Sequence, residues 1–80
     1  MDLDNLIVMA NKIGQFFAAQ PDRDEALDGI AEHIRKFWVP RMRSEILAAV
    51  DSDAGEQMSE IVRAALVKHR ASLAPVAAKA

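Results

Sequence analysis

Residues 34–43 have the sequence Ile34-Arg35-Lys36-Phe37-Trp38-Val39-Pro40-Arg41-Met42-Arg43, in which one proline separates two apolar segments. Proline fits the first position of a helix, because the backbone N–H that it lacks has no partner there. It also biases the residue before it, Val39, toward an extended conformation. The segment therefore predicts that one helix ends near Trp38, that the chain turns, and that the next helix begins at Pro40.

Apolar residues at helical spacing continue on both sides of this turn, and no stretch alternates with the period of a strand. Breaker residues separate helices that we expect at about residues 2–19, 22–38, 40–50 and from 53 onward. Pairs of the form D-x-x-E, typical of helix starts, begin at Asp22 and Asp53. Gly14 lies inside the first helix, where close approach of another helix would offset its low helix propensity. The predicted fold is all-α: a small compact domain of about four helices over residues 1–70, with a flexible, low-complexity tail at residues 71–80.

The first helix carries more apolar surface than a small monomer needs. Phe16 widens its buried stripe, and Val8 falls on the opposite face. The chain also has two adjacent aromatic pairs, Phe16-Phe17 and Phe37-Trp38. Neighbours on a helix point about 100° apart, so both members of a pair cannot enter one small core equally. We therefore expect a larger partner to cover part of this surface.

The composition argues against several classes of protein. The 80 residues contain no cysteine, which excludes a disulfide scaffold, thiolate metal ligation and a thiol nucleophile. The net charge of −2 argues against nucleic-acid binding. No apolar run approaches the length of about 20 residues that spans a bilayer. Asp2 and Asp4 leave no basic segment of a signal peptide, so we expect a cytoplasmic protein that binds neither nucleic acid nor membrane.

The polar residues form no recognisable catalytic or metal-binding pattern. The two histidines, His33 and His69, lie outside the spacings of zinc proteases, and no serine has a nucleophile-elbow context. We interpret His33 as a partly buried residue at the edge of the second helix. The prediction is a chain with no catalytic residue and no metal site, which is not itself an enzyme.

A basic cluster occurs around the proline, because residues 34–43 contain four bases and no acid. The two bases before the turn suit the negative end of the second helix. Arg41 and Arg43 fall in the first turn of the next helix, where cations are disfavoured. Two interpretations stay open: a solvated face paired with local acids such as Glu45, or a contact with an anion or an acidic surface, to which Trp38 adds apolar area.

Two segments together resemble a known family. Residues 9–17 have the pattern M-A-N-x-I-x-x-F-F, and residues 30–43 have the pattern I-A-x-H-I-x-x-F-W-x-P-R-M-R, with Pro21 between them. This long, ordered pattern is similar to the delta subunit of soluble NAD-dependent formate dehydrogenases of the molybdenum or tungsten type. The resemblance covers roughly residues 6–50.

The resemblance implies a small accessory chain that binds no cofactor of its own. In such complexes the catalytic alpha subunit holds a molybdenum or tungsten bis-molybdopterin guanine dinucleotide (bis-MGD) and iron–sulfur clusters. The beta and gamma subunits carry FMN and further clusters, and they pass electrons to NAD. The delta subunit is then expected to bind the alpha subunit and to support assembly, stability or cofactor insertion.

We expect the aromatic residues of the two pairs, the arginines of the basic cluster and one methionine to contact the partner: Phe16, Phe17, Arg35, Phe37, Trp38, Arg41, Met42 and Arg43. Three of these, Arg35, Arg41 and Arg43, are also candidates for contact with a phosphate of the guanine dinucleotide. Two other interpretations stay open. The chain could be a transient maturation chaperone for the molybdoenzyme, or a stand-alone helical protein–protein interaction module that forms a homodimer.

Overall fold

The computed structural model describes residues 2–75, which form helices and short connections. The elements are, in order, α1 (Leu3–Phe17), α2 (Arg23–Phe37), α3 (Pro40–Val50), the 3-10 helix η1 (Asp53–Gln57), α4 (Glu60–Lys68) and α5 (Arg70–Leu73). The predicted all-α fold is confirmed, and α1–α4 correspond to the four expected helices. Within these residues, no helix has both the length and the apolar character needed to cross a membrane.

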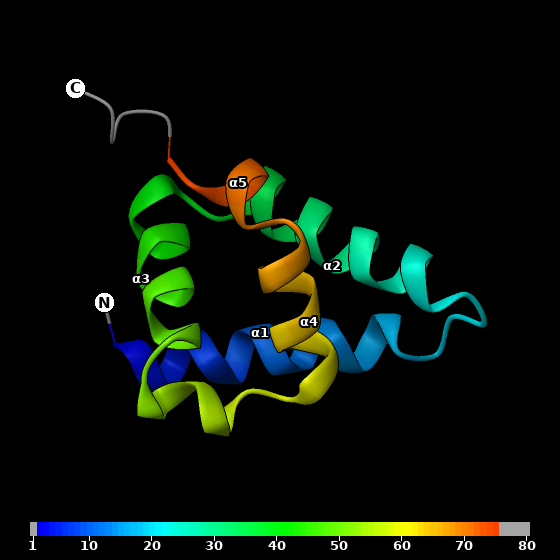
Figure 1. Cartoon of the computed structure of the whole chain (residues 1–80), viewed down its shortest axis with the longest axis horizontal. Helices are drawn as coiled ribbons and strands as arrows, with labels where there is room; N and C mark the ends of the chain where they lie inside the picture. The colour runs from blue at the N-terminus through cyan, green and yellow to red at the C-terminus, as the bar shows by residue number, and fades with distance from the viewer. Residues whose placement is uncertain (1, 76–80) are drawn as a thin grey trace.

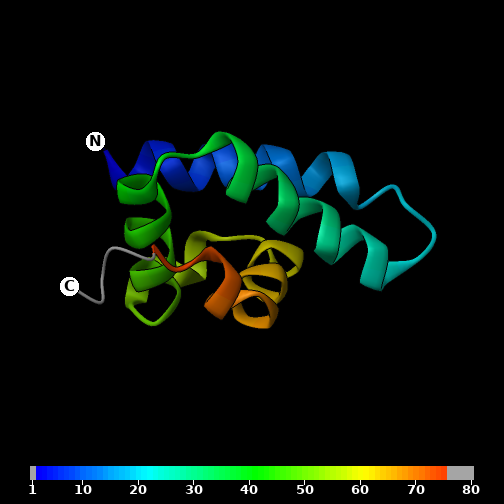
Figure 2. The same ribbon diagram turned by 90° about the horizontal axis from the view of Figure 1, so that it is seen from above.

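The helices are arranged in two layers. α1 and α2 form a hairpin, and α3, α4 and α5 pack against one of its faces (Figures 1 and 2). The core lies between the layers. Every α-helix contributes to the largest fully buried side chains of the core, which are Leu6, Ile30, Ile34, Ile46, Val62, Leu66 and Leu73. The opposite face of the hairpin, here called the outer face, is not covered by any element within residues 2–75 (Figure 2).

Three of the predicted helix starts are confirmed. The Asp2 carboxylate accepts a hydrogen bond from the backbone N–H of Asp4, and Asp22 accepts from the two N–H groups at the start of α2. These caps satisfy donors that the first turn of a helix leaves free. Pro40 is the first residue of α3, and Val39 before it is extended, with φ −70° and ψ 160°.

The predicted start of the fourth helix is wrong. Asp53 begins the five-residue 3-10 helix η1, whose N-cap is Ser52, and α4 begins only at Glu60. Between the two helices Met58 is extended and its side chain is 5% exposed within the core. A helix that continued from Asp53 would not have the extended backbone that Met58 adopts. Burial of Met58 therefore outweighs the helix-start signal of the D-x-x-E pair at Asp53.

The predicted tail is wrong at its start. Residues 70–73 form α5, and Leu73 is 0% exposed. The alanine-rich composition of this segment suggested a tail, although Leu73 within it packs in the core. Residues 76–80 of the predicted tail lie outside the described part of the chain.

Gly14 sets how closely α4 approaches α1. A Cβ atom at Gly14 would lie 2.6 Å from Val62 Cγ2 and 3.2 Å from Ile61 Cγ2, both on α4. Real Cβ atoms essentially never show the shorter of these distances. The predicted close approach of another helix at Gly14 is therefore confirmed.

Gly14→Ala should lower the free energy of unfolding by about 1–2 kcal/mol, because the strain from overpacking exceeds the gain in helix propensity. The control is Gln15→Ala on the exposed side of the same turn, which should change the free energy by less than about 0.5 kcal/mol. Urea unfolding followed by circular dichroism measures both. A Gly14→Ala protein more stable than wild type would contradict the packing described here.

Candidate functional site

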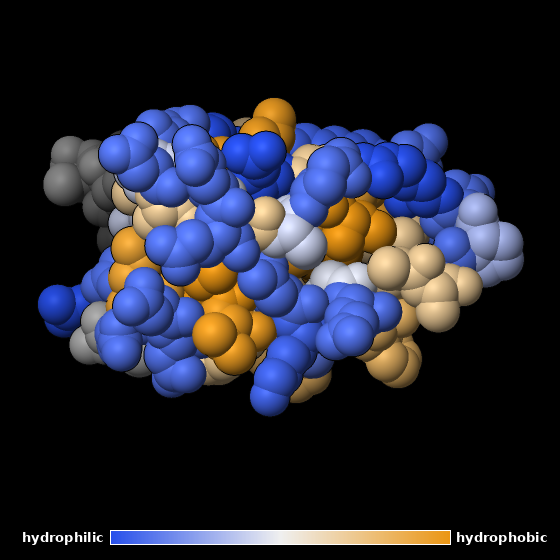
Figure 3. Space-filling model, turned by 90° about the horizontal axis from the view of Figure 1, so that it is seen from below, coloured by the Kyte–Doolittle hydropathy of each residue, from blue (hydrophilic) through white to orange (hydrophobic). Residues whose placement is uncertain are grey.

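Two phenylalanines stand out on the hairpin, because their side chains are large, apolar and mostly in water. Phe16, near the end of α1, is 73% exposed, and Phe37, the last residue of α2, is 71% exposed. Both were predicted to contact a partner. Figure 3 shows that apolar surface gathers over the C-terminal part of α1, between hydrophilic side chains. Full burial of a side chain of this size is worth about 1.5–3 kcal/mol, so covering these residues would favour association.

A hollow of about 350 Å³ lies next to Phe16, and residues of both α1 and α2 line it. Its lining residues, which define the α1–α2 hollow, are Lys12, Ile13, Phe16, Phe17 and His33. The rings of Phe16 and Phe17 meet edge to face, with centroids 5.1 Å apart. The ring of His33 lies 4.8 Å from that of Phe37. One pair of rings on α1 and one pair on α2 therefore lie at this hollow, with Phe16, Phe17 and His33 in its lining.

Gly29 holds one wall of the hollow in place. A Cβ atom at Gly29 would lie 2.5 Å from Cε1 of Phe17, so the ring occupies the space that a side chain would need. Phe17 is partly buried and packs against the core. Sequence reasoning missed Gly29 as part of the site, although a glycine inside a helix pattern is a signal of close packing.

Trp38 lies in the core instead of on the surface. Its side chain is 5% exposed, and it contacts the buried cluster between the layers. Trp38 follows Ile34 by four residues, so its ring continues the buried face of α2, and the chain leaves the helix there with φ −95° and ψ 135°. A partner contact of Trp38 stays a prediction. Met42 is also partly buried against the core.

Arg43 binds the chain's own carbonyl groups. Its Nε donates to the carbonyl oxygen of Leu73 at 2.9 Å, and its Nη1 donates to that of Trp38 at 2.9 Å and to that of Arg35 at 3.4 Å. These acceptors lie at the C-terminal ends of α2 and α5, where carbonyl oxygens lack helical partners. The unusual cation in the first turn of α3 thus stabilises the ends of two other helices, and its contact with a partner or a phosphate stays a prediction.

The other two arginines of the basic cluster have carboxylates close by. Arg35 Nη2 lies 2.9 Å from Glu32 Oε1, and Lys36 Nζ lies 3.3 Å from Glu32 Oε2. The hydrogen bond from Arg35, followed by that from Lys36, lowers the pKa of Glu32 below its ordinary value. Arg41 lies 3.6 Å from Glu45, as the solvated-face interpretation predicted, and its side chain is 81% exposed.

Within residues 2–75, the three arginines of the basic cluster bind different groups. Arg43 is bound to carbonyls, whereas Arg35 and Arg41 pair with different carboxylates on different helices. The three guanidinium groups therefore do not form one anion site. In the part of the chain that the structure describes, no group of three or more His, Cys, Asp or Glu side chains could hold a metal ion.

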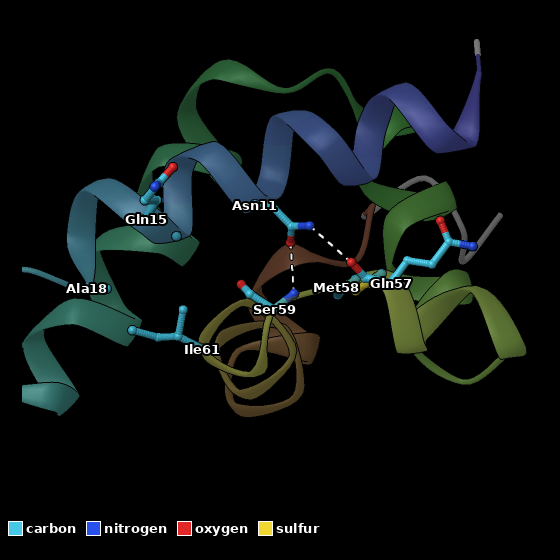
Figure 4. Close-up of a pocket in the computed structure, with 8 residues that line it drawn as sticks. Asn11, Gln15, Ala18, Gln57, Met58, Ser59 and Ile61 are labelled. Carbon is cyan, nitrogen blue, oxygen red and sulfur yellow. Dashed lines mark hydrogen bonds between the residues drawn. The ribbon is translucent and has the colours of Figure 1, made fainter.

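A second hollow, of about 400 Å³, lies between α1 and the connection from η1 to α4 (Figure 4). Asn11 fixes this connection: its Nδ2 donates to the carbonyl of Gln57 at 3.0 Å, and its Oδ1 accepts from the N–H of Ser59 at 2.9 Å. The two bonds hold the backbone on either side of buried Met58. Asn11 therefore has a structural role that the sequence did not reveal.

Charged groups join the end of α4 to α2 on the other side of the molecule. The Nε2–H of His69 donates to Asp28 Oδ1 at 2.7 Å, and Lys68 Nζ lies 3.2 Å from the same oxygen. The hydrogen bond from His69, followed by that from Lys68, lowers the pKa of Asp28 below its ordinary value of 3.8. His69 is thus part of an ion cluster that holds two helices together.

Comparison with models of known protein families finds a match. The model of the family described as NADH-dependent formate dehydrogenase delta subunit FdsD matches residues 5–66. This chain belongs to the FdsD family. The match extends from α1 through most of α4 and includes the whole α1–α2 hollow. No curated protein and no solved structure matches the chain.

Arg43→Ala should lower the free energy of unfolding of this family member by about 2 kcal/mol, because carbonyl acceptors at the ends of α2 and α5 lose a charged donor. Arg41→Ala, two residues away and exposed, is the matched control, with an expected change below about 0.5 kcal/mol. Urea unfolding measures the loss, and hydrogen exchange should show faster exchange in α5 for Arg43→Ala alone. Equal stability of the two variants would contradict the role of Arg43.

The ion cluster at Asp28 should make stability depend on pH under acidic conditions. Because the folded-state pKa of Asp28 is lowered, its contribution is present above 3.8 and is lost as the pH falls through the lowered pKa. Asp28→Asn should therefore be less stable than wild type at neutral pH, and the difference should shrink as the pH falls below 3.8. Thermal unfolding from pH 2 to 7 tests this, with Asp24→Asn as a control because its oxygen lies farther from Lys68, at 3.7 Å. A gap that is constant with pH would be inconsistent with this contribution.

Proposed function

We propose that the chain is a non-catalytic accessory subunit that binds the catalytic alpha subunit of a formate dehydrogenase complex and supports its assembly and stability. The name of the family, a delta subunit of formate dehydrogenase, supports the choice of this complex. The observation that carries the proposal is the pair of exposed phenylalanines on the hairpin, Phe16 of α1 and Phe37 of α2. Aromatic side chains of this kind supply much of the binding energy when a partner excludes water from them.

The positions of the polar residues support a role in binding instead of catalysis. His69 is engaged with Asp28, His33 lies against the ring of Phe37, and Arg43 holds the ends of two helices. We assign the oxidation of formate to CO2 with reduction of NAD+ to the other subunits. The same assignment places bis-MGD with molybdenum or tungsten, the iron–sulfur clusters and FMN on those subunits. The cytoplasmic location stays a prediction.

Co-purification tests the proposal. The alpha, beta and gamma subunits are expressed together with a tagged copy of this chain, and the eluate is assayed for subunit ratio and for NAD-linked formate oxidation. We expect a stoichiometric, active complex. The amount of alpha subunit that co-purifies with the double variant Phe16→Gln/Phe37→Gln should be about tenfold or more below the wild-type amount, because the variant loses the apolar contacts.

The matched control is Val67→Gln, which changes an apolar residue that is 57% exposed on α4. It should retain the alpha subunit as the wild type does. Circular dichroism verifies that all variants are folded. Recovery of the wild-type chain alone, with full activity in the untagged fraction, would contradict the proposal. Binding to immature alpha subunit that is lost before full activity would identify a maturation chaperone instead.

A further inference from the structure

Lys12 is a charged residue at the α1–α2 hollow that has no carboxylate close to it. Within residues 2–75, the ion pairs of the structure involve other cations, and Lys12 takes part in none. Its neighbours in the hollow are apolar or aromatic, with His33 as the other residue able to carry positive charge. A cation at the edge of an apolar surface can pair with a carboxylate that a partner brings.

Arg63 provides a useful contrast. It too takes part in no ion pair among the described residues, but its hollow between α3 and α4 also contains the carboxylates of Asp51 and Glu60. The hollow at Lys12 therefore has no acid in its lining, whereas two carboxylates, each also paired with another arginine, line the hollow at Arg63.

The last turn of α2 adds positive charge to the hairpin. Arg35 and Lys36 share the single carboxylate of Glu32, so these three side chains have a net charge of +1. This local excess occurs in a chain whose total charge is −2, so it is not a general property of the surface. The hairpin thus combines exposed rings with a local excess of positive charge, which is complementary to an apolar segment that also carries acidic residues.

We infer that the α1–α2 hollow receives a large apolar side chain of the alpha subunit, and that Lys12 pairs with a carboxylate beside that side chain on the same segment. The inference rests on the proposed function and specifies the chemistry of the partner segment. Gly29 contributes by letting the Phe17 ring pack in place before binding. A wall that is already formed reduces the ordering cost of association.

A second copy of this chain is a poorer occupant. In a twofold dimer the same patch meets itself, so the surface around Lys12 would face its own copy. The Lys12 side chains of the two copies would then lie close to each other, with no acidic residue in the lining of either hollow, and like charges across an interface oppose binding. An acidic segment of a different chain removes this conflict.

Charge reversal at Lys12 tests the inference in the complete complex. Lys12→Glu should weaken retention of the alpha subunit by about tenfold or more, because the lysine is replaced by a charge that repels the partner's carboxylate. Arg63→Glu makes the same change in net charge at a cation of α4 that also takes part in no ion pair among the described residues, and it should retain the alpha subunit as wild type does. Lys12→Arg should preserve binding, since the positive charge is kept.

A salt titration separates charge from shape. Dissociation of the wild-type complex should become faster as salt rises from about 50 to 500 mM, and Lys12→Met should show a weaker dependence, because one ion pair is missing. Equal retention by Lys12→Glu and Arg63→Glu would overturn the inference and leave the proposed function intact. If the wild-type chain does not bind the alpha subunit at all, the proposed function fails and the inference fails with it. A concentration-dependent dimer of the isolated chain that is lost in Lys12→Glu would identify a second copy as the occupant and overturn the inference.

Discussion

One guanidinium group joins three segments of the chain at the corner between α2 and α3. Arg43 donates to carbonyls near the end of α2 and to that of Leu73 at the end of α5. At the same corner the chain becomes extended, and Trp38 enters the core. Phe37, one residue earlier and still helical, is left in water. The packing of the corner therefore determines which aromatic residue of this pair remains available to a partner.

Local signals in the sequence predicted the order of the helices, the cap at Asp22 and the helix start at Pro40, because each depends on residues next to it in the chain. Gly14 was also interpreted correctly, since a glycine inside an apolar stripe weakens the helix unless close packing offsets the loss. The errors came from contacts between distant residues. Arg43 finds its acceptor at Leu73, 30 residues away, and no spacing within either segment signals that bond.

The same division applies to the candidate site. Phe16 and Phe37 could be recognised as too apolar for one small core, but the hollow between them depends on Gly29, which makes room for a ring from another helix. Lys12 becomes notable only when the ion pairs of the other cations are known. α3, α4 and α5 cover one face of the hairpin, and the rings of Phe16 and Phe37 on the hairpin stay mostly exposed.

The measurement that tests this view most directly is hydroxyl-radical footprinting of the free chain and of the purified complex, with side-chain oxidation quantified by mass spectrometry. Phe16 and Phe37 should be oxidised rapidly in the free chain and become protected in the complex. Val67 on α4 should be oxidised equally in both, and Trp38 should be protected in both. Protection confined to α4 and α5, with the two phenylalanines still oxidised in the complex, would contradict the assignment of the outer face.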